Sequence, residues 1–245
     1  MKISFRSPLF ICIMWLYLPI TPANGQIQDR LQGAWKSATG GVQEILLLQD
    51  GYLTHTTYDP AGKKFLMTRG GPFSFGGKEI SLLYEFHSSR PEETGSRQNW
   101  TYSVKNDILV LNIDGKEQEW IRVDDSSGPL AGVWKISDRM EGGELVKIHQ
   151  RGTRKTLKLL TGTRFQWFAI DPGTKMFAGT GGGTYSFDGG KYVENIEFFS
   201  RDNSRVGARL TFDGKLENGK WHHSGSGSKG DTIYEVWSRV YPGKP

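Results

Sequence analysis

Hydrophobic and polar residues alternate along much of the chain, which is the pattern of β-strands with two differently exposed faces. In residues 164–170, Phe165, Trp167 and Ala169 fall on one face, directly after the apolar run 157–160 and a Thr-Gly-Thr turn. The segments that follow Gly33 and Gly132 keep no 3.6-residue helical period, so at most a short helical turn is expected, near residues 29–32. Asp-Gly or Asn-Gly pairs, which favour two-residue hairpin turns, occur at positions 50–51, 114–115, 188–189, 213–214 and 218–219. This pattern predicts an all-β protein built from sequential hairpins.

The chain carries this pattern twice. Residues 31–36 (LQGAWK) return as residues 130–135 (LAGVWK), and the Trp-x-Arg-Val of residues 120–123 returns at residues 237–240. Between these ends, Glu85 matches Glu197 in a block of constant spacing. Such a fixed offset indicates duplication, with each copy a structural unit. We predict one unit over residues 26–125, a linker over 126–129 and a second unit over 130–245, and we expect the second unit to fold by itself.

The first 25 residues have the features of a signal peptide. Lys2 and Arg6 precede an apolar stretch, residues 9–20, that is short for a membrane span, and small residues at positions 23 and 25 suit a signal peptidase. We predict a mature chain that begins at Gln26 and is secreted or periplasmic, with no transmembrane segment. Cys12, the single cysteine, lies inside the apolar stretch, so the mature chain would have no disulfide and no thiolate.

Charge and composition restrict the partners. The net charge is +5 at pH 7, and the basic residues are spread among acidic ones rather than gathered in a stripe with interleaved aromatic residues. Nucleic-acid-binding proteins usually carry such a stripe, so no nucleic-acid partner is expected. The 32 glycines are in keeping with many tight turns between short strands.

The two framework motifs resemble those of the lipocalin, or calycin, family. In that family Gly-x-Trp lies on the first strand of a barrel and an arginine on the last strand packs against the tryptophan ring. The resemblance implies two tandem lipocalin-like antiparallel up-and-down β-barrels, with Trp35 against Arg122 and Trp134 against Arg239. A guanidinium over an indole is worth about 0.5–2 kcal/mol and would tie the first strand to the last. Within the second copy, residues 159–165, 183–187, 192–197, 220–225 and 235–239 also resemble secreted bacterial lipocalin-like domains of unknown function.

Polar and aromatic residues of the second copy are the candidate ligand-binding residues. Alternation places Trp221 and His223 on one strand face, and Glu235 on a face with Trp237. If both faces point inward, carboxylates and an imidazole converge in an aromatic pocket, the usual form of a ligand site. The alternative is that these residues lie on the rim or satisfy one another in a structural network. The complete candidate set is Trp167, Tyr185, Glu197, Trp221, His223 and Glu235.

We expect the site in the second copy, because the first has no counterpart of the Trp-His-His run and carries His55 at the Trp167 position. Adjacent histidines on a strand point to opposite faces, so neither a metal site nor another cofactor is expected. The sequence favours a non-catalytic binding protein for a small, partly apolar ligand. Two alternatives stay open: an enzyme that uses Glu and His for acid–base chemistry, such as hydrolysis or isomerisation, and an interaction module whose barrels are filled by side chains.

Overall fold

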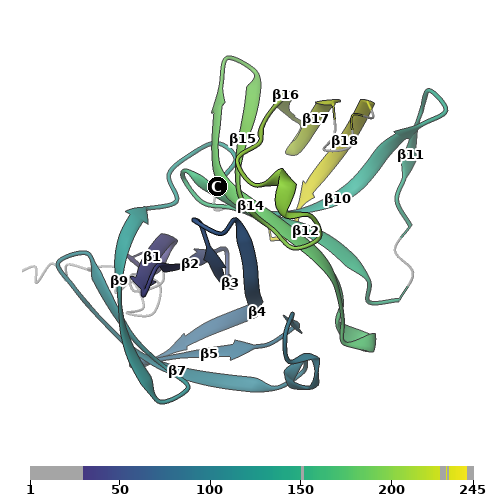
Figure 1. Cartoon of the computed structure of the whole chain (residues 1–245). Helices are drawn as coiled ribbons and strands as arrows, with labels where there is room; N and C mark the ends of the chain where they lie inside the picture. The colour runs from purple at the N-terminus through teal and green to yellow at the C-terminus, as the bar shows by residue number, and fades with distance from the viewer. Residues whose placement is uncertain (1–29, 150–151, 227–229, 231, 242–245) are drawn as a thin grey trace, which may run out of the picture.

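The chain forms two closed antiparallel β-barrels of eight strands each, one after the other in the sequence (Figure 1). The computed structural model describes residues 30–149, 152–226, 230 and 232–241. The predicted signal peptide and Cys12 lie outside these residues. The prediction of an all-β fold with two tandem barrels is confirmed, and the architecture is consistent with a calycin-like fold.

The first barrel is a meander that closes on itself. Each strand pairs with the next, and the last strand pairs with the first. A short strand β6 (Phe86–His87) adds to β4, and the 3₁₀ turn η1 (Pro91–Glu93) follows it. The barrel strands are β1 (Gly33–Thr39), β2 (Val42–Gln49), β3 (Tyr52–Asp59), β4 (Lys64–Gly76), β5 (Glu79–Leu83), β7 (Arg97–Lys105), β8 (Ile108–Ile113) and β9 (Lys116–Asp124).

The second barrel repeats this plan, and β18 closes on β10. The far end of β10 pairs with β11 (Glu144–Lys147), a hairpin that projects from the barrel in Figure 1. The 3₁₀ turns η2 (Pro172–Thr174) and η3 (Asn203–Arg205) connect strands. No helical segment among the described residues has the length and apolar character to span a membrane. The barrel strands are β10 (Gly132–Glu141), β12 (Lys155–Leu160), β13 (Arg164–Asp171), β14 (Met176–Asp188), β15 (Lys191–Phe199), β16 (Arg209–Glu217), β17 (Lys220–Ser226) and β18 (Thr232–Arg239).

Three of the five Asp-Gly and Asn-Gly pairs form the predicted turns, and next to a fourth, at 188–189, the turn lies one residue later, at Gly189 and Gly190. At positions 50–51, 114–115 and 218–219 both residues have positive φ angles between strands, as two-residue hairpins require. The turn prediction for positions 213–214 is wrong, because both residues lie inside β16. Gly214 packs closely there, since a Cβ atom would lie 3.0 Å from the ring of Phe187.

In each barrel, an arginine of the last strand stacks on a tryptophan of the first strand. The guanidinium carbon of Arg122 lies 4.0 Å from the ring centroid of Trp35, and that of Arg239 lies 4.3 Å from the ring of Trp134. The two residues of each pair are also direct partners across the seam between first and last strand. The guanidinium of Arg239 donates to the Ala131 carbonyl at 2.7 Å. Each seam therefore combines a cation–π contact with hydrogen bonds to the entering chain.

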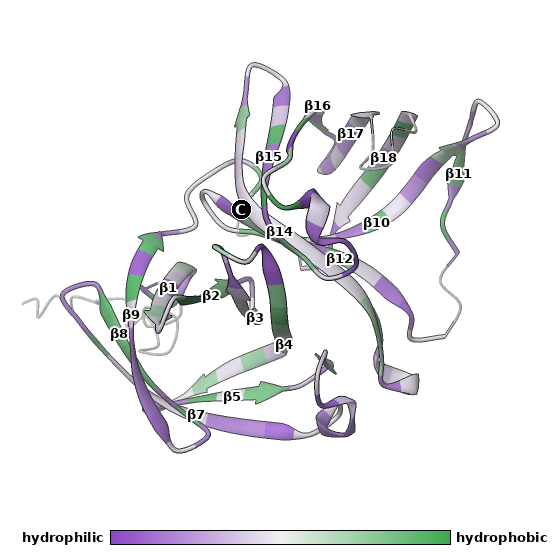
Figure 2. Cartoon of the chain, in the orientation of Figure 1, coloured by the Kyte–Doolittle hydropathy of each residue, from purple (hydrophilic) through white to green (hydrophobic). Residues whose placement is uncertain are grey.

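The barrels bury a shared apolar interface. One cluster of buried residues contains Ile45, Tyr52 and Tyr58 from the first barrel together with Leu157 and Phe168 from the second. Hydrophobic and polar residues alternate along the strands in Figure 2, yet both faces of β3 are buried along most of its length, as are both faces of β12 from Leu157 onward. One face lines its own barrel and the other faces the neighbouring barrel. The second barrel cannot be separated without exposing this apolar face to water.

Polar side chains are buried in the same interface. The amide nitrogen of Gln166 donates to the hydroxyls of Thr68 and Thr180, each at 3.0 Å, and its oxygen accepts from Thr56 at 3.1 Å. Beside the linker, the Asp124 carboxylate accepts a hydrogen bond from the Thr163 amide at 2.9 Å. The two barrels are thus held by directional contacts as well as by apolar burial.

Candidate functional site

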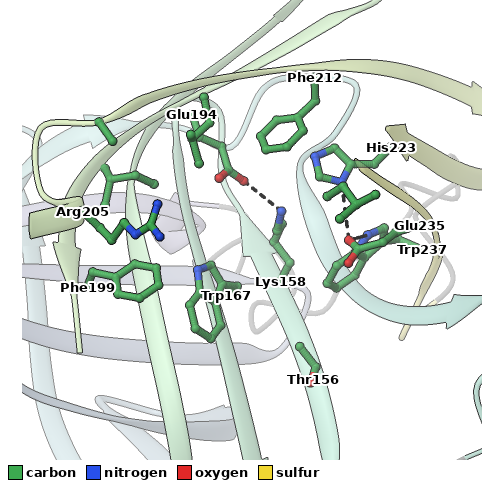
Figure 3. Close-up of a pocket in the computed structure, with 14 residues that line it drawn as sticks. Thr156, Lys158, Trp167, Glu194, Phe199, Arg205, Phe212, His223, Glu235 and Trp237 are labelled. Carbon is green, nitrogen blue, oxygen red and sulfur yellow. Dashed lines mark hydrogen bonds and ion pairs between the residues drawn. The ribbon is translucent and has the colours of Figure 1, made fainter. Parts of the chain in front are cut away.

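A cavity of about 290 Å³ lies inside the second barrel (Figure 3). Its walls are largely apolar and aromatic, and the rings of Trp167 and Phe199 meet at 5.5 Å between centroids. The apolar lining residues are Trp167, Ile196, Phe199, Ala208, Leu210, Phe212, Ile233 and Trp237, and the polar ones are Thr156, Lys158, Glu194, Arg205, His223 and Glu235.

Strand alternation supplies this lining. On β17, Trp221 and His223 both point into the barrel, and on β18 Glu235 and Trp237 do the same. The predicted pocket required these two strand faces to point into the barrel, and they do. His222, which lies between Trp221 and His223 on β17, points away from the cavity. Its Nδ1 atom lies 2.9 Å from the Tyr234 hydroxyl.

Lys158 and Glu194 form a buried ion pair at one side of the cavity. The Lys158 Nζ atom lies 2.9 Å from Glu194 Oε1, and each side chain is less than a tenth exposed. The Tyr192 hydroxyl donates to the same carboxylate oxygen at 2.9 Å. The ammonium also lies 5.1–5.8 Å from the ring centroids of Phe165, Tyr192, Trp221 and Trp237. A desolvated ammonium among rings is stabilised by cation–π attraction in addition to its counter-ion.

His223 and Glu235 form a second polar pair. Nδ1 of His223 lies 3.5 Å from Glu235 Oε2, which is long for a hydrogen bond. Trp237 Nε1 donates to the same carboxylate oxygen at 3.1 Å. Burial lowers the pKa of His223 even though the Glu235 carboxylate acts to raise it. Burial acts to raise the pKa of Glu235, but His223 and Lys158 together hold it below its ordinary value. The pair is therefore a neutral imidazole beside a carboxylate.

The imidazole of His223 has unused hydrogen-bonding capacity. The ring is 3% exposed, and neither nitrogen has a hydrogen-bond partner within the described part of the chain. Phe212 lies against the ring, with centroids 4.2 Å apart. Buried polar atoms in folded proteins nearly always have a partner. Within the described part of the chain, the hydrogen-bonding capacity of this imidazole is therefore unused at the cavity wall.

The structure brings together three of the six predicted ligand-binding residues, namely Trp167, His223 and Glu235, at the cavity wall. Trp221 is fully buried behind the wall, against His223 and Tyr192. Tyr185 donates to the Thr161 carbonyl at 2.6 Å and packs in the core.

The structure does not bring Glu197 to the cavity. Its carboxylate lies at the interface between the barrels, where it pairs with Arg164 and accepts a 2.7 Å hydrogen bond from Tyr58. Along β15, Glu194 and Ile196 line the cavity, so strand alternation turns Glu197 to the opposite face. A β-bulge opposite Gly182 and Gly183 then shifts the register, and Phe199 is the next residue of β15 to line the cavity. The expectation that Glu197 shares an inner site with His223 is corrected here.

Sequence reasoning missed Lys158 and Glu194 as site residues. A signal for Lys158 was present, because a single lysine interrupts the apolar run 157–160. The strand pairing makes the contrast sharper: Trp134 pairs with Lys158, whereas the equivalent Trp35 pairs with Leu46. Glu194 belongs to one of the segments that resemble lipocalin-like domains, residues 192–197, but the sequence around a carboxylate does not show whether it points into or out of a barrel.

The interior of the first barrel holds a partnered polar network instead. His55 Nε2 lies 2.7 Å from Glu44 Oε2, and its Nδ1 accepts from Arg69 Nε at 3.2 Å. Arg69 in turn pairs with Asp114 at 2.9 Å. Both imidazole nitrogens of His55 are thus occupied, in contrast to those of His223.

The described residues contain no group of three His, Cys, Asp or Glu side chains placed to hold a metal ion. Neither the family models nor the curated proteins compared with this chain match it.

Proposed function

We propose that this chain is a secreted, lipocalin-like binding protein that holds a small, partly apolar ligand in its second barrel. The observation that carries the proposal is the buried His223 imidazole, unpartnered at the wall of an aromatic cavity. A cavity of about 290 Å³ is near the lower end of the range for ligand sites, which indicates a small ligand. The predicted signal peptide supports secretion.

The contrast between the barrels supports the choice of the second one. Where the second barrel has Lys158, Glu194 and His223, the strand register of the first places Leu46, Leu82 and Leu111. Leucines at these positions are compatible with the same closed barrel. The polar residues are therefore not required by the fold, and a bound ligand gives them a role.

The test is a binding titration of the full chain with the neutral apolar dye N-phenyl-1-naphthylamine, followed by dye and tryptophan emission. Ala208 lines the cavity, so Ala208→Trp should block saturable binding by filling it. Ser96→Trp, at the equivalent position of the first barrel, is the matched control and should bind like the parent protein. Binding that is lost equally in both variants, or in neither, would place the dye outside this cavity and contradict the proposal.

Acid–base catalysis is the second candidate, favoured by the contact between His223 and Glu235. A carboxylate that orients an imidazole is a common arrangement for a general base. The two functions are separated by recovering a ligand retained from the host and incubating it with fresh protein. A binding protein returns the compound unchanged, whereas an enzyme converts it. If the compound is converted, Glu235→Gln should slow the conversion more than it weakens binding.

A further inference from the structure

Lys158 contributes a primary amine to the cavity wall, and nothing in the barrel fold requires it. It stands on β12, where the first barrel has Leu46 in the same register. The side chain is 6% exposed and lines the cavity. A lysine in an apolar pocket is a frequent nucleophile towards carbonyl compounds.

The charges around the cavity favour a neutral ligand. The charged side chains at the cavity balance, with Lys158 and Arg205 against Glu194 and Glu235, so a charged ligand of either sign would meet like charge. Lys158 and Glu194 already pair at 2.9 Å. Apart from Thr156 and His223 the rest of the wall is apolar and aromatic, so the compound that fits best is neutral and apolar, with one polar group able to meet the amine.

We propose that the second barrel captures a neutral, apolar aldehyde by forming an imine with Lys158. This deepens the proposed function, on which it rests. Glu194 accepts a proton from the ammonium, and the freed nitrogen lone pair attacks the carbonyl carbon. The carbonyl π electrons move to oxygen, which takes up the proton that the attacking nitrogen loses, to give a carbinolamine. Glu194 returns its proton to the carbinolamine hydroxyl, which leaves as water while the nitrogen lone pair forms the C=N bond, so that ammonium and aldehyde become protonated imine and water.

Two features of the site suit this step. The positive charge on the lysine nitrogen is the same before and after reaction, so Glu194 keeps its role as counter-ion and no unpaired charge is left buried. His223 carries an unpartnered nitrogen at the same cavity, which can accept a hydrogen bond from the carbinolamine hydroxyl. The four rings around Lys158 limit access of water, which would hydrolyse the imine.

The test uses the full chain, trans-cinnamaldehyde and cyanoborohydride, which reduces an imine to a stable secondary amine. Intact mass and peptide mapping should show one adduct, located at Lys158 rather than on exposed lysines. Lys158→Arg keeps a cation for Glu194 but forms no imine, so the adduct should be lost. Lys155→Arg, on the same strand but paired with Glu85 at the interface, is the matched control and should retain it.

Cinnamyl alcohol separates this proposal from the function on which it rests, because it has the same shape without the carbonyl. Displacement of the dye by both compounds with no adduct at Lys158 would overturn imine formation and leave ligand binding intact. Failure of both compounds and of the dye to bind would overturn both proposals. Since the adduct is mapped in the parent protein, the result stands even if Lys158→Arg folds poorly, and thermal denaturation of each variant checks this.

Discussion

Glu85 and Glu197 occupy equivalent positions in the two barrels, and each carboxylate joins its own barrel to the other. Glu85 accepts a 2.7 Å hydrogen bond from Tyr52 of its own barrel and pairs with Lys155 of the second barrel at 2.7 Å. Glu197 pairs with Arg164 of its own barrel and accepts from Tyr58 of the first barrel. The equivalent carboxylates of the two repeats thus both contribute polar contacts to the interface, one from each barrel.

Loss of either carboxylate should destabilise the whole protein without affecting the cavity. Glu197→Gln leaves the half-buried Arg164 guanidinium without its ion-pair partner, and we expect a loss of about 1–3 kcal/mol in the free energy of unfolding. Urea denaturation measures this loss, with Glu85→Gln as the equivalent change in the first barrel. An unchanged midpoint together with weaker dye binding would return Glu197 to the list of ligand-binding residues.

Gln166 should be among the most sensitive positions of the interface. It is fully buried and satisfies three threonine hydroxyls from two barrels. Gln166→Ala removes these partners and opens a void, so we expect a loss of about 2–4 kcal/mol in unfolding free energy. Denaturant unfolding followed by tryptophan emission should show whether the barrels still unfold together. A change below about 0.5 kcal/mol, typical of surface positions, would contradict burial of this amide.

Trp134 and Arg239 should be energetically coupled. Arg239→Ala removes a guanidinium stacked 4.3 Å from the Trp134 ring and its hydrogen bonds to the entering chain, with an expected loss of about 1–3 kcal/mol. A double-mutant cycle with Trp134→Phe measures the coupling. Trp35 and Arg122 provide an independent repeat of the measurement. Strict additivity of the two changes at both seams would show that the stacking contributes nothing.

The protein should lose stability as the pH falls below about 6.5. Burial, with help from Arg69 and Arg90, lowers the pKa of His87 from 6.5 to about 4. Between these values the unfolded chain binds a proton that the folded chain does not, so this histidine lowers the unfolding free energy by at most about 1.4 kcal/mol per pH unit. Burial lowers the pKa of His55 and His223 in the same direction.

Denaturation midpoints measured from pH 7 to pH 4 test this expectation. His87→Gln should flatten the decline in that window, because glutamine does not titrate. His149→Gln changes an exposed histidine and serves as the control, with an unchanged profile. A parent protein equally stable at pH 7 and pH 4 would contradict neutral buried histidines.

The candidate site could be predicted only in part. Alternation correctly placed Trp221 with His223 and Glu235 with Trp237, because the two-residue period of a strand is a local property. The expectation for Glu197 was wrong, because Glu194 and Ile196 take the inward positions of β15 and Glu197 lies on the opposite face, against Tyr58. The β-bulge beside it depends on a close approach of β14 to β15: a Cβ atom on Gly183 would lie 2.0 Å from the Asn195 carbonyl oxygen. Lys158 was missed because its inward position depends on the pairing of β12 with β10.

The sequence by itself determined the all-β class, the hairpin turns at residues 50–51, 114–115 and 218–219, and the duplication. These features follow from local backbone preferences and from motifs that repeat in the chain, whereas the pairs Trp35–Arg122 and Trp134–Arg239 were implied by the resemblance to lipocalins. Only the tertiary structure decided which polar residues are buried. Thr56 and Gln166 have the alternation of solvent-facing positions, yet they lie at the interface between the barrels. Alternation distinguishes two faces of a strand but carries no information about what covers the outer one, and here a second barrel covers it.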